Sequence, residues 1–301
     1  KVAAALASPN EIIPGSPTTA ADRIAAANVG QTDKFGSALV KAQDVLATQP
    51  EKGIADVAKS IAAQQEAARA AELGTVAQTP SALASAVAGR KAASTANYPQ
   101  AFGQHIGIDN ELMSMSENPY FRGALADATR VANARAQRTG KPLDLTEQLH
   151  LLKLALDKKM ARTGDTALSS TEKMEVTKLQ DQLVSWLGKK NPAYETARAA
   201  HEAASRPINQ MKVGQDLQRA ITAPVSGAER AASFGNALRT AENKVSASTG
   251  RTRIADLTPD QLAAVKRVEA ELARNAERDA LGSGVNPKNL FDMAERGKGS
   301  F

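Results

Sequence analysis

Histidine is the side chain best suited to acid–base chemistry near neutral pH, and the sequence has three, His105, His150 and His201. No two of them stand at the spacing that would place both imidazoles on one helix face around a metal ion. A solvated or hydrogen-bonded role is therefore favoured for each of them over catalysis or metal binding. The chain has no cysteine, which excludes disulfide bonds, thiolate metal ligands and thiol nucleophiles.

The motifs of common catalytic sites are missing as well. There is no Gly-x-Ser-x-Gly nucleophile turn and no phosphate-binding loop, and the Gly-Lys-Gly-Ser run at 297–300 lacks the upstream glycine that such a loop needs. Most carboxylates stand beside Lys or Arg in helical segments, a pattern typical of a solvated, ion-paired face. The sequence thus favours a non-enzymatic protein, with no catalytic residue, cofactor or metal assigned.

Positive charge is concentrated in residues 118–162, which carry nine basic and four acidic side chains. Basic side chains on one face can contact phosphates and give non-specific binding that weakens with salt. An ordinary basic surface is the favoured alternative, because no DNA-reading motif accompanies the charge and stacking aromatics are scarce. The candidate contacts to DNA or another anionic surface are Arg130, Arg135, Arg138, Lys153, Lys158 and Lys159.

Residues 191–217 combine polar and apolar side chains in an unusual density. Because a proline disfavours the α conformation of the residue before it, this stretch predicts two helices that are hinged at Arg206-Pro207. In the favoured interpretation it is a structural corner, in which the Tyr194 ring is buried with its hydroxyl on a partner and two amides satisfy backbone groups beside the proline. The alternative is a contact between subunits. The residues concerned are Tyr194, Arg198, Arg206, Pro207, Asn209, Gln210 and Met211.

The elements that position these residues are predicted to be helices. Of the 301 residues 42% are hydrophobic, but many of these are alanines and only 3% of the chain is aromatic. Such a core is thin, since an alanine methyl removes little area from water. The composition suits long helices in close contact, or helices completed by neighbouring subunits. We therefore expect an all-α, multi-helix and elongated fold, with helical hairpins joined by loops that Pro and Gly punctuate, and with little or no β structure.

The chain is expected to divide into three regions. Residues 1–95 form an alanine-rich, extended or peripheral helical region, beginning with an irregular arm and ordered mainly by contacts with something else. Residues 96–293 form the main helical unit, and residues 294–301 a flexible basic tail. The candidate boundary is 92–117, which is rich in turn formers and has no sustained period.

Helix boundaries can be located from capping patterns. Pro119 and Gly140 bound one predicted helix, and helices over 53–73 and 79–91 precede it. Capping boxes are predicted at Asp144/Glu147 and Ser169/Glu172, and a similar start at Thr258–Gln261. The two capped helices, ending near Met160 and at Gly188, are predicted to form an antiparallel hairpin.

Targeting signals are weak. No apolar run approaches the ~20 residues that span a bilayer, and the opening residues lack a signal-peptide apolar core. The net charge of +6 is modest for 301 residues. Because the chain lacks an initiator Met, we expect a processed product or part of a longer polypeptide.

Several motifs in order resemble a known family. LHLLKLALDKK (149–159) is followed by NPAYETARAAHEAASRPINQMKVGQ (191–215), SFGNALRTA (233–241), LTPDQLAAV (257–265), VEAELAR (268–274) and GS…NL (282–290). Together these motifs, over residues 98–293, resemble large helical proteins of tailed phages and prophages that are described as internal virion or DNA-ejection proteins. Some members of that family are fused to lytic or other enzymatic domains.

The resemblance implies a structural virion protein that leaves the head with the genome and helps to conduct DNA across the host envelope as an oligomer. The partners implied are further copies of the chain, the portal or other ejection proteins, DNA bound non-specifically, and the envelope after ejection. The location implied is inside the capsid or at the portal, and then the host cell envelope. Two alternatives remain: the non-catalytic helical part of a larger phage lytic or multi-enzyme virion protein, and a non-specific nucleic-acid-binding helical module.

Overall fold

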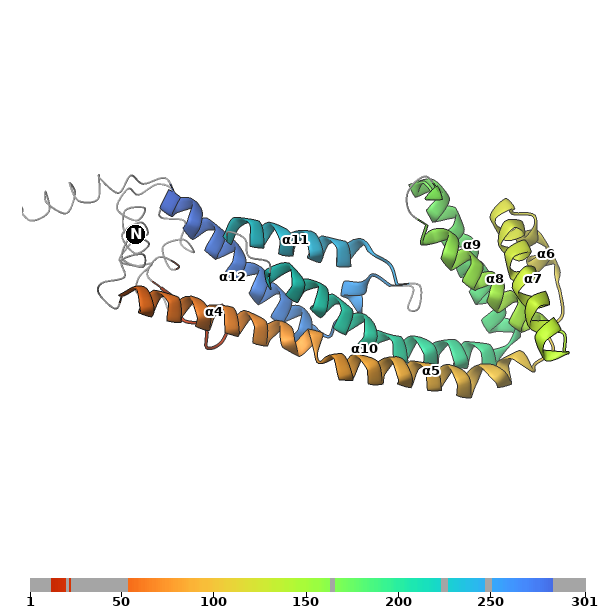
Figure 1. The fold of residues 1–301 in the computed structure, drawn as a ribbon. Coiled ribbons are helices and arrows are strands. Elements are labelled where there is room, and N and C mark those ends of the chain that lie inside the picture. Colours follow the sequence, from red (N-terminus) through yellow and green to blue (C-terminus); the bar gives the residue numbers. More distant parts are fainter. Residues whose placement is uncertain are drawn as a thin grey trace, which may run out of the picture. The chain divides into compact units, whose positions relative to one another are not determined.

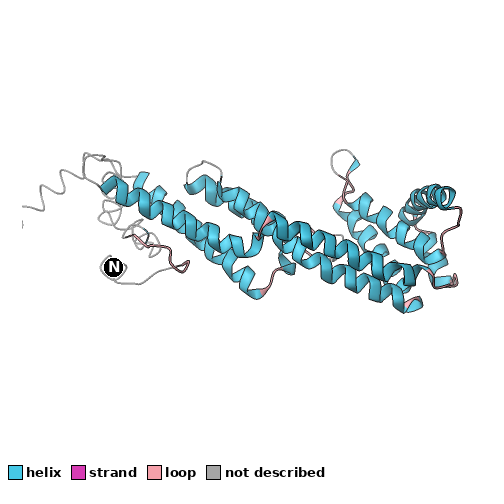
Figure 2. Cartoon of the chain, turned by 60° about the horizontal axis from the view of Figure 1, so that its bottom comes forward, coloured by secondary structure: helices cyan, strands magenta, loops and turns pink. Residues whose placement is uncertain are grey.

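The computed structural model describes residues 12–19, 22, 54–162, 166–222, 227–246 and 251–283. Within these residues 83% are helical and no strand is present (Figure 2). An isolated bridge pairs Val245 with Thr252. The predicted all-α class is confirmed. Residues 1–11, 20, 21 and 23–53 of the expected N-terminal helical region and the tail 294–301 lie outside the described residues.

The helices of the described residues follow one another with short connections (Figure 1). In chain order they are α4 (Ile54–Ala77), α5 (Pro80–Phe102), α6 (Asn110–Ser116), α7 (Pro119–Thr139), α8 (Leu145–Met160), α9 (Ser170–Lys190), α10 (Pro192–Thr222), α11 (Gly227–Asn243), the 3-10 helix η3 (Arg253–Asp256) and α12 (Pro259–Ser283).

Three predicted helix starts are confirmed. Asn118 accepts a hydrogen bond from the backbone N–H of Tyr120, with proline at the first helical position of α7. Ser169 and Glu172 form a complete capping box at α9. Thr258 and Gln261 make the same reciprocal pair of hydrogen bonds before α12.

Two further predictions are wrong in part. Asp144 does precede α8, which begins at Leu145, but its side chain makes no capping hydrogen bond, and Glu147 instead binds Arg135 of α7 at 2.9 Å. The stop at Gly188 is also wrong, because α9 continues to Lys190 and Asn191 ends it. In both cases a longer-range contact outweighs the local signal: an ion pair for Glu147, and for Asn191 a buried amide that donates to Ala101 O at 2.8 Å.

The predicted break at Arg206-Pro207 is wrong, since α10 runs through Pro207 as one helix. A proline removes one backbone hydrogen bond and crowds the preceding turn, which costs about 3 kcal/mol. Apolar burial on both sides offsets this cost, with Tyr194 and Ala197 before the proline and Ile208 and Met211 after it. Likewise α5 does not end near Lys91 but extends into the predicted boundary region 92–117, as far as Phe102.

The described residues form two compact units, and each is described by itself. Unit 1 comprises residues 12–19, 22, 54–83, 207–222, 227–246 and 251–283; unit 2 comprises 84–162 and 166–206. This division differs from the expected one near residue 95, because α4 contacts α12 although some 200 residues separate them. The units divide at the Arg206-Pro207 bond, inside α10.

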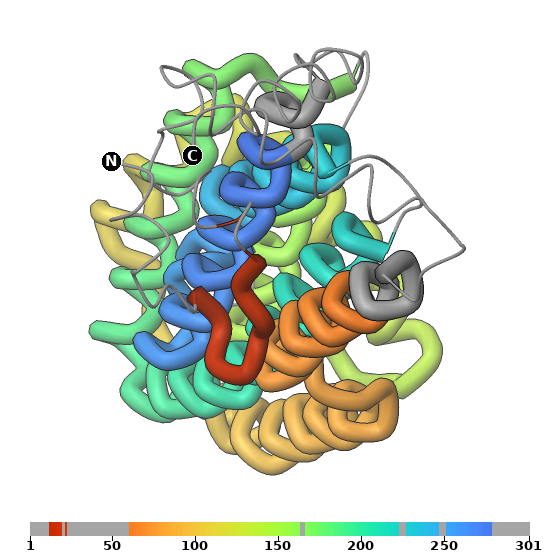
Figure 3. The backbone as a smooth tube through the Cα atoms, turned by 90° about the vertical axis from the view of Figure 1, so that its left-hand side faces the viewer, coloured from red at the N-terminus to blue at the C-terminus, as the bar shows by residue number. Residues whose placement is uncertain are grey.

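Unit 1 is built on an α11–α12 pair that α4 and α10 complete. The non-helical segment 12–19 lies against α12 and α4 (Figure 3). Within this segment Gly15 has a φ of 75°, and Ile13 and Ser16 are each 1% exposed. The first described residues therefore belong to a core. Its larger apolar members are Ile13, Leu73, Val76, Val213, Leu217, Ile221, Phe234, Leu238, Val265, Val268 and Leu272.

Unit 2 contains the predicted hairpin of α8 and α9. Gln180 binds Asp157 and Thr177 binds Met160, a register that makes the two helices antiparallel. Helix α7 also packs antiparallel to α8, and α6 contacts α7 and α9. The larger apolar members of this core are Ile106, Leu112, Met115, Phe121, Leu149, Leu151, Leu152, Leu156, Val176, Leu179, Leu183, Trp186, Leu187 and Tyr194.

Candidate functional site

Unit 2 gathers two histidines and three aromatic side chains into an aromatic cluster. Its members are Tyr98, Phe102, His150, Tyr194 and His201. The ring centroids of Tyr98 and His150 are 4.8 Å apart, and those of Tyr98 and Phe102 are 5.3 Å apart. The predicted burial of Tyr194 is confirmed, and its hydroxyl lies 3.1 Å from His150 Nδ1.

Helical periodicity explains how the cluster is assembled. On α5, Tyr98 stands one turn after Ser94 and one turn before Phe102, so all three share a face. On α10, seven residues separate Tyr194 from His201, which again places both on one face. Ser94 Oγ lies 2.8 Å from His201 Nδ1 and donates to Arg90 O. The Nδ1–H of His201 therefore donates to Ser94, and this arrangement does not activate the serine as a nucleophile.

The two histidines of the cluster are neutral at pH 7. The pKa of His150 is lowered to about 4, mainly by burial and in addition by the charges of Lys153, His201 and Arg135. Burial also lowers the pKa of His201, with Arg90 and Lys153 acting in the same direction. The pKa values of Tyr98 and Tyr194 are raised by burial. The third histidine, His105, is exposed and lies apart from these rings.

The predicted corner residues before Pro207 lie on the surface of α10, except Tyr194. Arg198 binds Glu195 at 2.7 Å and Glu202 at 3.5 Å, and Arg206 binds Glu202 at 3.1 Å. These are ion pairs within one helix at spacings of three and four residues. A role of Arg198 and Arg206 in contacts between subunits stays a prediction.

The corner residues after Pro207 face inward. The Asn209 amide donates to Ser246 Oγ at 2.9 Å and to Asp256 Oδ2 at 2.6 Å, while the Gln210 amide donates to Asp256 O at 2.7 Å. Met211 is buried. The prediction that these amides satisfy backbone groups beside Pro207 is therefore wrong. They attach α10 to the turn after α11 and to η3 instead.

The predicted basic surface is partly neutralised by its own helices. Arg130 binds Asp127 at 2.6 Å, Arg135 binds Glu147 at 2.9 Å, and Lys153 binds Asp157 at 2.6 Å. The other three candidates lie elsewhere on α7 and α8: Arg138 and Lys158 are exposed, and Lys159 lies against Gly123. The six candidates thus do not act as six uncompensated charges, which weakens the case for a phosphate-binding face.

A buried polar cluster in unit 1 was not predicted. Glu271 of α12 accepts hydrogen bonds from Arg69 of α4 at 2.9 Å and from Ser16 at 3.2 Å, and the charged pair is almost fully buried. Beside it, Gln65 donates to Asp22 and to Pro17 O. A signal was available, because Glu271 follows Val268 at helical spacing and so falls next to the apolar stripe of α12.

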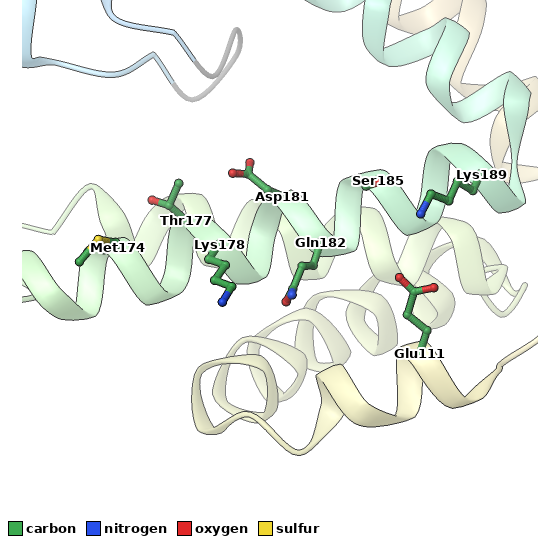
Figure 4. Close-up of a pocket in the computed structure, with 8 residues that line it drawn as sticks. All are labelled: Glu111, Met174, Thr177, Lys178, Asp181, Gln182, Ser185 and Lys189. Carbon is green, nitrogen blue, oxygen red and sulfur yellow. The ribbon is translucent and has the colours of Figure 1, made fainter.

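A shallow groove of about 680 Å³ lies between α6 and α9 (Figure 4). Figure 4 shows Glu111 of α6 pointing toward α9, whose polar side chains form most of the lining. Nearby, Asp109 caps α6 and binds Trp186 and Lys190 of α9. The Lys190 hydrogen bond is the main cause that lowers the pKa of Asp109 to about 2. The lining residues are Glu111, Met174, Thr177, Lys178, Asp181, Gln182, Ser185 and Lys189.

In the part of the chain that the structure describes, no group of three or more His, Asp or Glu side chains is arranged to hold a metal ion. None of the described helices combines the length and apolar character that a bilayer crossing requires. Comparison with known proteins finds no matching family model, and no curated protein or solved structure matches the chain.

Proposed function

We propose that the chain is a structural component of a tailed-phage particle, packaged internally and ejected with the genome. In this role it helps to deliver DNA across the host envelope and acts as an oligomer. The observation that carries the proposal is the ordered set of motifs over residues 98–293, which resembles internal virion and DNA-ejection proteins.

The positions of these motifs support the proposal. The motif 149–159 falls on α8 and supplies His150 to the aromatic cluster. The motif 191–215 falls on α10, and the motifs at 233–241 and 268–274 supply Leu238 and Leu272 to the core of unit 1. Four of the motifs thus lie on helices whose side chains form the two cores.

Composition also supports delivery through a narrow channel. Both cores contain alanines among larger aliphatic side chains, and alanine burial stabilises a fold less than burial of Leu or Phe. A protein that passes through a portal has to unfold or elongate, and a thin core lowers the free energy of doing so. Further copies of the chain would then add the missing buried area after passage.

The proposed partners are other copies of the chain, the portal or further ejection proteins, and DNA held without sequence preference. The proposed location is the capsid interior or the portal, followed by the host envelope. Helix faces that carry exposed apolar side chains are available for such contacts, for example Met113 on α6 and Met174 on α9.

The test is to measure this chain by quantitative mass spectrometry in purified full particles and in particles emptied of DNA. We expect the chain in full particles and a loss of most copies on emptying, with the major capsid protein as the constant reference. Absence from both preparations would overturn the proposal. Retention in emptied particles would contradict ejection, and discovery of its peptides within a longer catalytic polypeptide would favour the lytic-protein alternative.

A further inference from the structure

The distribution of histidines differs between the two units. All three histidines of the chain lie within residues 84–206, and two of them enter the aromatic cluster. This cluster is also where the second half of α5, residues 94–102, attaches to α8 and α10. Unit 1 therefore lacks the only side chain whose ordinary pKa lies between pH 5 and 8.

Three side chains of residues 94–102 contact a histidine. Ser94 binds His201, and the rings of Tyr98 and Phe102 pack on His150. At the end of the segment, Ala101 O accepts the buried Asn191 amide. Two imidazoles that are neutral and largely enclosed thus contribute to the attachment, beside the buried Asn191–Ala101 hydrogen bond.

The charges around the two histidines are mainly positive. Lys153 on α8 and Arg135 on α7 act on His150, and Arg90 on α5 acts on His201. A protonated His150 and a protonated His201 would also repel each other. Protonation of either histidine therefore adds a positive charge beside these basic side chains, in a site that is partly shielded from water.

The neighbouring carboxylates are engaged elsewhere. Glu147 on α8 binds Arg135, and Asp157 accepts hydrogen bonds from Lys153 and Gln180. On α10, Glu195 and Glu202 bind arginines of the same helix. Among the described residues, no carboxylate forms an ion pair with either imidazole. A proton taken up by the cluster would lack a compensating anion.

We infer that the aromatic cluster is an acid-sensitive contact: protonation of His150 and His201 releases residues 94–102 of α5 from α8 and α10. Mild acid would then expose the faces of α8 and α10 that carry His150, Tyr194 and His201. This inference does not depend on the proposed phage function, because it follows from the contacts and charges of unit 2 alone.

The sign and size of the effect follow from proton linkage. In the closed state the pKa of His150 is about 4, against an ordinary value of 6.5 once the segment has opened. The open state then binds protons more tightly than the closed state. The free energy of opening is therefore highest and constant above pH 7, and it decreases as the pH falls through 6.5. Linkage through His150 alone favours opening about 30-fold at pH 5, and His201 adds to this. The gain levels off below about pH 4.

Amide hydrogen exchange of the full chain between pH 7.5 and pH 4.5 tests the inference. After correction for the intrinsic pH dependence of exchange, peptides covering 94–102 should exchange about 20-fold faster at pH 5 than at pH 7 from the linkage through His150. Peptides from α12, in the unit without histidine, are the internal control and should keep their protection. Unchanged protection of 94–102, or an equal loss in α12, would overturn the inference.

Two variants identify the titrating group. His150→Gln should remove most of the pH dependence at 94–102, whereas His105→Gln, which alters the exposed histidine, should retain all of it. Full pH dependence in His150→Gln would contradict the inference. If His150→Gln does not fold, NMR titration of the unaltered chain decides: the His150 ring signal should stay in its neutral position down to pH 5, and a transition near pH 6.5 would overturn the inference.

Discussion

Gly214 of α10 meets the end of α4 so closely that no side chain fits between them. A Cβ atom at this position would lie 2.7 Å from the Val76 carbonyl carbon and closer still to the backbone of Ala77. Because backbone atoms cannot move aside as a side chain can, Gly214→Ala should lower the free energy of unfolding by about 3 kcal/mol, the upper end of the usual overpacking range. Urea unfolding followed by circular dichroism measures this change.

Gly235 of α11 is the matched control in the same unit. A Cβ at this position meets nothing within 4 Å, so Gly235→Ala should raise the free energy of unfolding by about 0.5–1 kcal/mol through better helix propensity. Similar effects of the two substitutions would show that the close approach of α10 and α4 is not as described.

Asn209 and Arg206 stand on either side of the proline and make different contacts. Asn209→Ala removes two hydrogen bonds from a buried site and should cost about 1–3 kcal/mol. Arg206→Ala removes one exposed ion pair within α10 and should change stability by about 0–1 kcal/mol. Urea unfolding of both variants measures these changes. An unchanged stability of Asn209→Ala would contradict a structural role within the chain and would favour a role in contacts between subunits.

Side-chain burial in this stretch was predictable, but most of the partners were not. The spacing of Ile208, Met211, Leu217 and Ile221 follows the helical period, which predicts one inward face, and all four side chains are buried. The partners of Asn209 could not be predicted, because Ser246 and Asp256 follow it by 37 and 47 residues and carry no local signal. The same holds for His150, whose aromatic neighbours come from α5 and α10.

At the scale of elements, the Arg69–Glu271 pair joins α4 to α12 and helps to hold the segment 12–19 through Ser16. Replacing either partner alone leaves an uncompensated buried charge, so Arg69→Met or Glu271→Leu should each cost about 3–5 kcal/mol. The double variant should regain a large part of this loss. A double-mutant cycle by urea unfolding measures the coupling, and strictly additive losses would contradict the described pair.

An exposed pair on the same helix is the control for that cycle. Lys266 and Glu269 of α12 lie 2.8 Å apart but are both solvated. Their replacement by alanine should change stability by about 0.5 kcal/mol or less. In Glu271→Leu, limited proteolysis should cut first within residues 12–19, whereas the Lys266 and Glu269 variants should retain the cleavage pattern of the unaltered chain.

Helix boundaries were predicted correctly where capping residues determine them, and incorrectly where core packing determines them. The starts of α7, α9 and α12 follow from short patterns that satisfy free N–H groups within three residues. Pro207 and the turn-rich end of α5 give strong local signals against a helix. Core contacts made by Ile208 in one unit and Ala101 in the other outweigh these signals. Those contacts join residues far apart in the chain and leave no local signal in the sequence.

At the scale of the whole molecule, the two apolar cores share no residue, and each lies within one unit. The only tryptophan of the chain, Trp186, is in the core of unit 2, so its fluorescence reports on that unit, whereas far-UV circular dichroism reports on both. We predict urea transitions with different midpoints for the two signals. Coincident midpoints would show that the units unfold as one cooperative body.

The all-α class was predictable because alanine-rich segments with helical period dominate the sequence. The composition of the units was not, since unit 1 joins segments from both ends of the chain. The bond from Ser16 to Glu271 spans 255 residues and involves a segment whose Pro and Gly content indicates an irregular arm. Contacts between residues so far apart in the chain produce no periodic pattern in a single sequence.

The central claim, delivery with the genome, is tested most directly by following the protein into the cell. Particles carrying this chain with an isotopic label are allowed to infect cells in which new protein synthesis is blocked. Cell envelopes are then separated from external particles. We predict that the labelled chain is in the envelope fraction while the labelled capsid protein stays outside; a chain that remains with the emptied particles would contradict the account.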